Sequence, residues 1–167
     1  MAIVFPGGTQ GGPAKILQVV NTLKTDNWST TSSAWTTVTG LTISFTPSDN
    51  TNKVLVSTSV VISGDVQGRR FAMRLIRNST PLQFADAAGS RTRASYGGTA
   101  YGGGNGGAFV GALQILDSPA TTSTVTYGVQ AIALDGGAVR VNWHNNDSND
   151  SSHSVSASTI TCMEVDA

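Results

Sequence analysis

The densest group of side chains able to do chemistry lies in one polar segment. His144 and His153 bracket this segment, and Asp147 and Asp150 lie between them. Carboxylates, amide carbonyls and imidazoles all ligate cations. The spacing matches neither an EF-hand loop nor a His-x-x-x-His site, and Asn, Asp and Ser are ordinary residues for a loop between strands. We therefore predict no metal or other cofactor, and a cation bound by the 144–153 loop remains the alternative.

The residue patterns that nucleophilic and acid–base catalysis need are not visible. Cys162 lies inside an alternating apolar run, which predicts a buried and unreactive thiol. No strand-turn-helix signature of a nucleophilic serine is present. Nothing in the sequence pairs Glu164 with a second carboxylate at the separation that glycoside hydrolysis requires. The sequence thus predicts a protein that is not an enzyme, and a small hydrolase is the remote alternative.

A Gly- and Tyr-rich stretch over residues 91–107 is the main candidate for recognition. It contains no Gly-Lys-Ser/Thr motif and no adjacent helix, which argues against a phosphate-cradling loop. We expect a long surface loop here, with tyrosine and arginine side chains of the kind that make adaptable contacts. The candidate receptor-contact residues are Arg91, Arg93, Tyr96 and Tyr101.

The elements that must position these residues are predicted to be strands. Over residues 41–46 apolar side chains alternate with Thr and Ser, which is the period of a half-buried strand. Turn-forming residues follow over 47–52, and residues 53–62 read as a second, more fully buried strand. We predict that these two strands form a hairpin around which the rest of the chain is organised. Residues 71–84 predict a second hairpin, with its turn at Asn78–Pro81.

Further strands are predicted along the whole chain. Eight to ten short strands can be counted, no segment has helical periodicity, and turn signals recur about every ten residues. This spacing is typical of an all-β sandwich or jelly roll. The fold class is therefore a single β-sandwich or jelly-roll domain over residues 15–167, preceded by an extended Gly/Pro-rich arm over residues 1–14.

Composition narrows the classes of function. The 167 residues include ten basic and ten acidic side chains, so the formal net charge is zero, and only 12% are charged. Nucleic-acid binders usually carry a basic excess, which argues against that class. Zero net charge favours association, as in a component of an assembly. Residues 1–5 are too few for a signal-peptide core, and no apolar run approaches the ~20 residues of a membrane span. We expect synthesis in a host cytoplasm and no membrane insertion.

A set of short segments lies mainly in the two outer thirds of the chain. They include Ile16–Val20, Lys24–Asp26, Val38–Leu41, Lys53–Val56, Leu116–Pro119, Tyr127–Gln130 and Ser158–Thr161. In this order along the chain, the segments resemble those of a family of tailed-bacteriophage virion proteins, found in phages of aquatic bacteria and in cyanophages. The resemblance implies a β-sandwich module without known catalytic residues, often described as a tail-fibre or virion structural protein.

The leading hypothesis is a homotrimeric tail-fibre or appendage tip, located in the virion, that contacts the host surface. Its partners would be further copies of itself, other virion proteins and host cell-surface polysaccharide. The runner-up is a capsid decoration (cement) protein docked on the head shell by its arm, through Ile3, Val4, Phe5 and Pro6. A carbohydrate-binding lectin module is the rival from another class, because Trp28 and Trp143 could join the tyrosines in stacking on sugar rings. Trp143 is nevertheless expected to point into the core.

Overall fold

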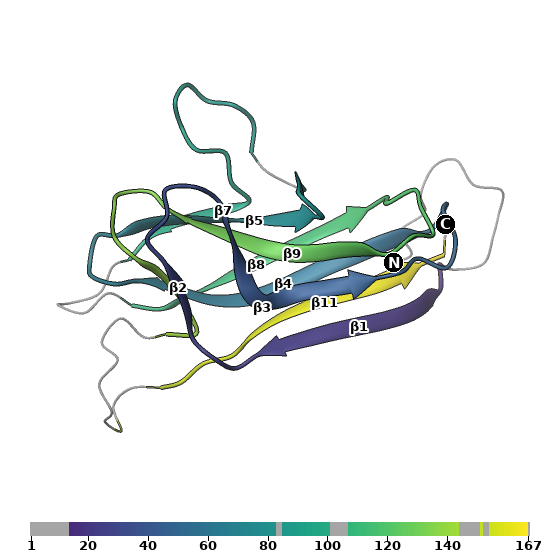
Figure 1. Ribbon diagram of the computed structural model, residues 1–167, viewed down its shortest axis with the longest axis horizontal. Helices are drawn as coiled ribbons and strands as arrows, with labels where there is room; N and C mark the ends of the chain where they lie inside the picture. Colours follow the sequence, from purple (N-terminus) through teal and green to yellow (C-terminus); the bar gives the residue numbers. More distant parts are fainter. Residues whose placement is uncertain (1–13, 83–84, 101–106, 144–150, 152–153, 167) are drawn as a thin grey trace, which may run out of the picture.

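The computed structural model describes residues 14–82, 85–100, 107–143, 151 and 154–166, and these form strands and connecting segments without a helix (Figure 1). The N-terminal half contains β1 (Ile16–Lys24), β2 (Trp28–Thr30), β3 (Thr36–Phe45), β4 (Lys53–Gly64), β5 (Arg70–Arg77) and β6 (Thr80–Pro81). The C-terminal half contains β7 (Tyr96–Thr99), β8 (Phe109–Asp117), β9 (Val125–Ala133), β10 (Val139–Val141) and β11 (Ser158–Val165).

The strands form two antiparallel sheets that pack face to face. In the first, here called sheet A, the long strands lie in the order β1-β11-β4-β8, and the short β10 and β2 extend it beyond the end of β11. In the second, sheet B, the order is β3-β9-β5, with β6 and β7 both on the far side of β5. When the short strands β2, β6 and β10 are left out and the remaining eight are renumbered 1 to 8 along the chain, sheet A has the order 1-8-3-6 and sheet B has the order 2-7-4-5. The predicted β-sandwich is confirmed, and its topology is that of a jelly roll.

The hairpin predicted over residues 41–62 is wrong. β3 pairs with β9 in sheet B, whereas β4 pairs with β11, β8 and β10 in sheet A. The connection over residues 47–52 therefore crosses from one sheet to the other. Its reason is that both strands have a buried face, and the sandwich lets the two faces meet across the core instead of lying side by side in one sheet. Pro47, which is buried, begins the crossing.

The core lies between the two sheets and is built from the side chains of each strand that face the opposite sheet. β4 buries every second residue from Val54 to Ile62, and β3 buries Leu41, Ile43 and Phe45 opposite them. The Phe45 ring meets that of Tyr127 edge to face, with centroids 6.4 Å apart. Cys162 is buried among these residues, as predicted, and burial raises the pKa of its thiol to about 12.

Two further segments differ in detail from expectation. The turn at residues 78–79 closes a hairpin as predicted, with Asn78 at φ 55°, but β6 on its far side is only two residues long. The stretch over 91–107 was expected to be a loop throughout, and the structure places strand β7 within it. β7 contains two glycines, which hide its strand character from the sequence pattern.

Candidate assembly surface

The inward face of sheet A holds a buried carboxylate near the chain termini. Glu164 on β11 is fully buried and accepts hydrogen bonds from Gln18 on β1, Ser48 in the β3–β4 connection and Asn52 before β4, at 2.5–2.8 Å. Burial alone would raise the pKa of Glu164, but hydrogen bonds from Asn52, Gln18 and Ser48 outweigh it and lower that pKa to about 2. The carboxylate thus fastens three segments of the chain together and is closed to any substrate.

A second buried carboxylate links the two sheets. Asp117 ends β8 in sheet A and accepts hydrogen bonds from Arg77 Nη1 and Tyr127 Oη of sheet B, both at 2.7 Å. The Tyr127 side chain is wholly buried, and burial and this hydrogen bond raise its pKa far above the ordinary value of 10. Tyr127 therefore stays neutral and donates to Asp117 at every physiological pH. The cluster is a structural strap rather than an acid–base pair.

The loop that could ligate a cation lies outside the described residues, because His144, Asp147, Asp150 and His153 are not among them. Within the described ranges no group of three or more His, Cys, Asp or Glu side chains could hold a metal ion. The same part of the chain has no helix long and apolar enough to cross a membrane.

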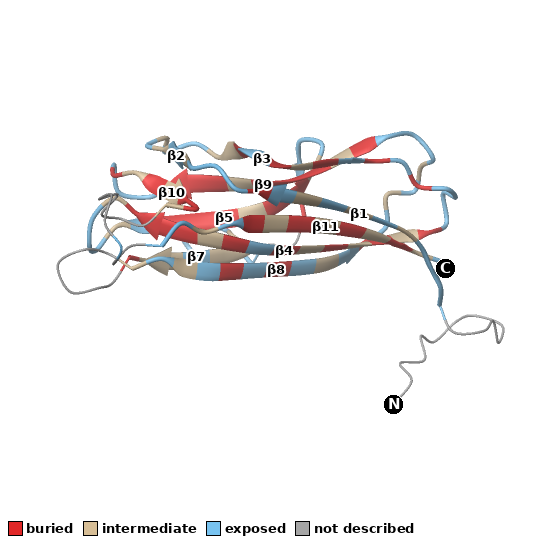
Figure 2. Ribbon diagram, turned by 90° about the horizontal axis from the view of Figure 1, so that it is seen from below, coloured by how far each residue is buried: buried red, intermediate tan, exposed pale blue. Residues whose placement is uncertain are grey.

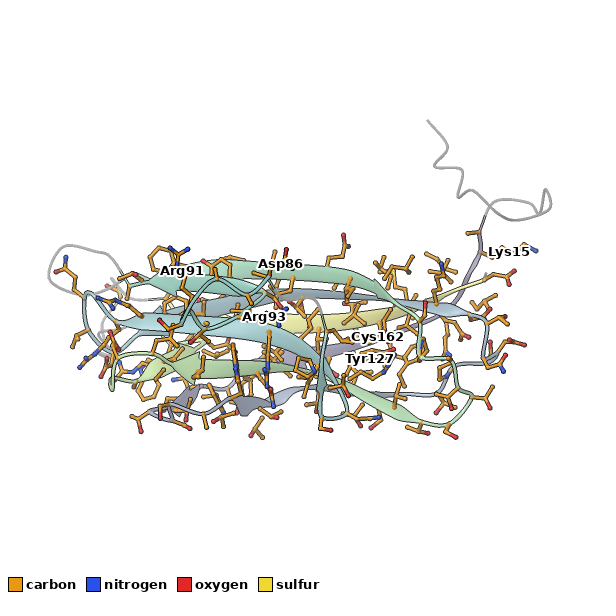
Figure 3. All side chains as sticks on the ribbon, turned by 90° about the horizontal axis from the view of Figure 1, so that it is seen from above. Lys15, Asp86, Arg91, Arg93, Tyr127 and Cys162 are labelled. Carbon is orange, nitrogen blue, oxygen red and sulfur yellow. The ribbon has the colours of Figure 1, made fainter. Side chains whose placement is uncertain are left out.

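The four predicted receptor-contact residues are not gathered into one site. Arg91 and Arg93 are exposed on the segment between β6 and β7, which projects from the body of the molecule (Figures 1 and 3). Arg93 Nε donates to the carbonyl of Ala85 within that segment at 2.7 Å. Tyr96, by contrast, lies on β7, packs against the core and stacks on Phe71. Tyr101 and the arm residues Ile3, Val4, Phe5 and Pro6 lie outside the described residues.

The tryptophans are likewise committed to contacts within the chain. Trp28 packs against the core from β2, and the half-buried Trp143 carries the guanidinium of Arg140 over its ring at 4.4 Å. The sequence drew no attention to Trp35, which lies under the guanidinium of Arg74 at 4.3 Å on the outward side of sheet B. Trp28, Trp35 and Trp143 therefore each have a contact within the described part of the chain.

The outward face of sheet A is a different kind of surface, and the sequence pattern alone did not identify it. Here "outer face" means the side of β1, β11, β4 and β8 that points away from sheet B. Side chains in register across the four strands form rows on this face. One row is wholly apolar: Val19, Met163, Leu55 and Leu116. The next is polar: Asn21, Thr161, Ser57 and Gln114. The one after it contains Leu23, Thr159, Ser59 and Ala112.

The two edge strands of sheet A, β1 and β8, carry many exposed residues, which are pale blue in Figure 2. Nine large apolar side chains are exposed among the described residues, and six of them lie on these two strands. They are Ile16, Leu17, Val19, Leu23, Val110 and Leu116. The charged residues of the two strands, Lys24 and Asp117, are buried, so the outer side chains of β1 and β8 carry no charge. Exposed apolar residues gathered in this way mark interaction surfaces.

Comparisons with known proteins add little to this geometry. No family model matches the sequence, and no curated protein matches it. Among solved structures, a chain in the structure of infectious bursal disease virus Gx strain is similar, with a TM-score of 0.44 and 11% identity. The match covers 98% of the present chain and 44% of that viral chain, so this chain spans less than half the length of its structural neighbour. A likeness this distant carries no information on function.

Most of the exposed large apolar side chains of the described residues lie on β1 and β8, the two edge strands of sheet A. The carboxylates of Glu164 and Asp117, by contrast, are buried and hydrogen-bonded within the chain. What the described surface offers is a partly apolar sheet face with open edges, on which Lys53, in register with Val165, is the charged residue of β4. The period-2 pattern indicates that Val19, Leu55 and Met163 are apolar at positions that alternate with the buried ones, but the row that they form requires the register between strands.

Proposed function

We propose that this chain is a structural protein of a tailed-bacteriophage virion and that it works as a trimeric tail-fibre or appendage tip. The observation that carries the proposal is the outer face of sheet A. A jelly roll whose buried carboxylates, Glu164 and Asp117, are hydrogen-bonded within the chain still exposes apolar side chains in rows across four strands, at zero net charge. Such a surface suits a subunit that is buried in an assembly.

The position of the projecting segment supports a role as a tip. In Figure 3, Lys15, at the start of the described chain, lies near one end of the long axis, and Arg91 lies toward the other end. A subunit attached through its N-terminal end would therefore keep Arg91 clear of the attachment point, on a segment that projects from the side of the sandwich (Figure 1). Both side chains are exposed and can donate charge-assisted hydrogen bonds to an anionic or hydroxyl-rich host surface.

A capsid decoration protein is the second candidate, and one observation favours it. Tyr96, the central aromatic residue of the proposed contact stretch, is committed to packing against Phe71 and the core. A tip deprived of this residue has less to offer a receptor, whereas docking on a head shell needs only the arm and an apolar sheet face. A lectin module has weaker support still, since Trp28 and Trp143 are also engaged within the chain.

The test is the number of copies in purified virions, counted by quantitative mass spectrometry against the major capsid protein. A few tens of copies or fewer are expected for a tail appendage, and hundreds would assign the chain to the head shell. Complete absence from virions would contradict both forms of the proposal. Binding of the purified chain to host polysaccharide without virion incorporation would support the lectin module instead.

A further inference from the structure

We infer that β8 of one copy pairs with β1 of a second copy, so that sheet A runs continuously from subunit to subunit around a closed ring. The occupant of these open edges is thus another copy of the same chain. The number of copies, three, is taken from the proposed function, and the pairing itself rests on the geometry of β1 and β8.

The first argument is that both edges are open and unprotected. In the described part of the chain, β1 pairs only with β11, and β8 pairs only with β4. Native proteins usually shield a sheet edge with outward lysines, prolines, β-bulges or very short strands. Here each edge strand is nine residues long and neither contains proline. β1 has one register irregularity, between Ile16 and Gln18, and its pairing is regular from Gln18 to Lys24. The charged side chains of both strands, Lys24 and Asp117, are buried, so nothing on either edge repels a partner strand.

The second argument is direction. β1 is antiparallel to β11, β11 to β4, and β4 to β8, so three reversals leave β8 antiparallel to β1. A second copy placed beside the first in the same orientation therefore presents β1 antiparallel to β8, which is the arrangement of every pair already in the sheet. Repeating this step by rotation about an axis along the strands closes a ring. All copies then point the same way, with their N-terminal ends on one side.

The third argument is that the outer side chains match in kind. If each row of the outer face continues into the next copy, Leu116 lies opposite Val19, and Gln114 lies opposite Asn21. In the same register Ala112 lies opposite Leu23. Apolar residues meet apolar ones, and the two amides can hydrogen-bond to each other, which is what stabilises cross-strand pairs. A shift by one residue would instead bring inward-facing side chains into the outer rows.

Disulfide trapping tests both the edges and the register. In the full-length chain, Val19→Cys combined with Leu116→Cys cannot form a bond within one copy, because three strand spacings separate the positions by about 14 Å. Between copies the two positions would be cross-strand neighbours, at the ~4.5–5.5 Å Cα separation that a disulfide accepts. Under mild oxidation we expect covalent dimers and trimers of the chain on non-reducing gels.

The matched control is Val19→Cys with Val110→Cys, on the same two strands but six residues away along β8, about 20 Å. This pair should give no more covalent dimer or trimer than the wild-type chain. Any cross-linking of the wild type measures the contribution of its native cysteine, Cys162. Equal trapping of both pairs, trapping by Leu116→Cys alone, or no trapping in a protein that is trimeric by mass would each overturn the inference. The last result would leave the proposed virion role standing.

The arm is the other chain segment that could occupy the edge of β8. Deletion of residues 2–13 from the Val19→Cys/Leu116→Cys variant should leave the trapped species unchanged. Loss of trapping in the truncated chain would make the arm the occupant and contradict the pairing of β8 with β1. Virion incorporation of the untruncated chain, measured separately, tests the proposed function and does not depend on either result.

Discussion

The two faces of sheet A are made by the same four strands and have opposite characters. On the inner face, apolar side chains are buried against sheet B, and the carboxylates of Glu164 and Asp117 are hydrogen-bonded within the chain. On the outer face, Val19 and Leu116 end a wholly apolar row and are 56% and 39% exposed. Successive residues of each strand point to opposite faces, so the difference between the two faces is determined by which residues stand at alternate positions. We interpret the inner face as the part that folds the chain and the outer face as the part that assembles it.

The contrast predicts its largest effect in the core. Phe45→Ala should lower the free energy of unfolding by about 3–5 kcal/mol, because it removes a buried ring and leaves a cavity beside Tyr127. Ser44→Ala, at the exposed neighbouring position, is the matched control and should change stability by less than about 0.5 kcal/mol. Urea denaturation measures both. Similar values for the two variants would mean that the interior is not packed as described.

Loss of the buried charge should come next. The pKa of Glu164 in the folded protein is about 2, below its ordinary value of 4.5, so the unfolded chain binds the extra proton between these values. The stabilisation by the Glu164 carboxylate is therefore complete above pH 4.5 and is lost as the pH falls toward 2. The difference between the two pKa values corresponds to about 3 kcal/mol of stability. Glu164→Gln should lower stability at pH 7 and flatten the stability–pH curve in that window. A mutant curve parallel to that of the wild type would contradict the role of this carboxylate.

A smaller effect is expected at the strap between the sheets. Tyr127→Phe removes the hydroxyl that donates to Asp117 but keeps the ring, and Arg77 still pairs with the carboxylate. The expected loss is about 1 kcal/mol, the usual net contribution of one hydrogen bond. The loss should be the same from pH 6 to pH 8, because the raised pKa keeps Tyr127 neutral throughout. Chemical denaturation at several pH values in this range measures it, and a loss that varied with pH would be inconsistent with this assignment.

The outer face should show the smallest effect on folding and a clear effect on association. Val19→Ser with Leu116→Ser should change the unfolding free energy of the monomer by less than about 0.5 kcal/mol, because both side chains are exposed. Sedimentation should show that the same variant no longer forms oligomers. Leu134→Ser is the control, an exposed apolar residue away from sheet A, and should affect neither property. Oligomers that survived in the double variant would place the subunit contact elsewhere.

Sequence reasoning recovered the class of the fold and much of its strand content. The pattern predicted strands over residues 41–46, 53–62 and 71–84, which correspond to β3, β4 and the β5–β6 hairpin, and further short strands along the chain. It could not assign strands to sheets. The residues before and after the 47–52 connection look the same whether the strands pair or face each other, so β3 and β4 were taken for a hairpin. The deciding contacts, those of Ser48 and Asn52 with Glu164, join residues more than a hundred positions apart.

The candidate site was harder to predict than the fold. Tyr and Arg in a glycine-rich stretch suggested a contact loop, but Tyr96 is drawn into the sandwich by β7, whose glycines concealed the strand. The apolar row of the outer face is assembled from four strands distant in sequence, and it exists only once the register is known. The composition, with 12% charged residues and zero net charge, predicted association, and that stays a prediction.

The central claim, that this subunit is built to assemble through the open edges of sheet A, is tested most directly by the mass of the purified full-length chain in solution. Light scattering or sedimentation equilibrium at micromolar concentration should give three times the mass of one chain for the wild type. The Val19→Ser/Leu116→Ser variant should give the mass of a single chain under the same conditions. A wild-type protein that keeps the mass of a single chain would contradict the account.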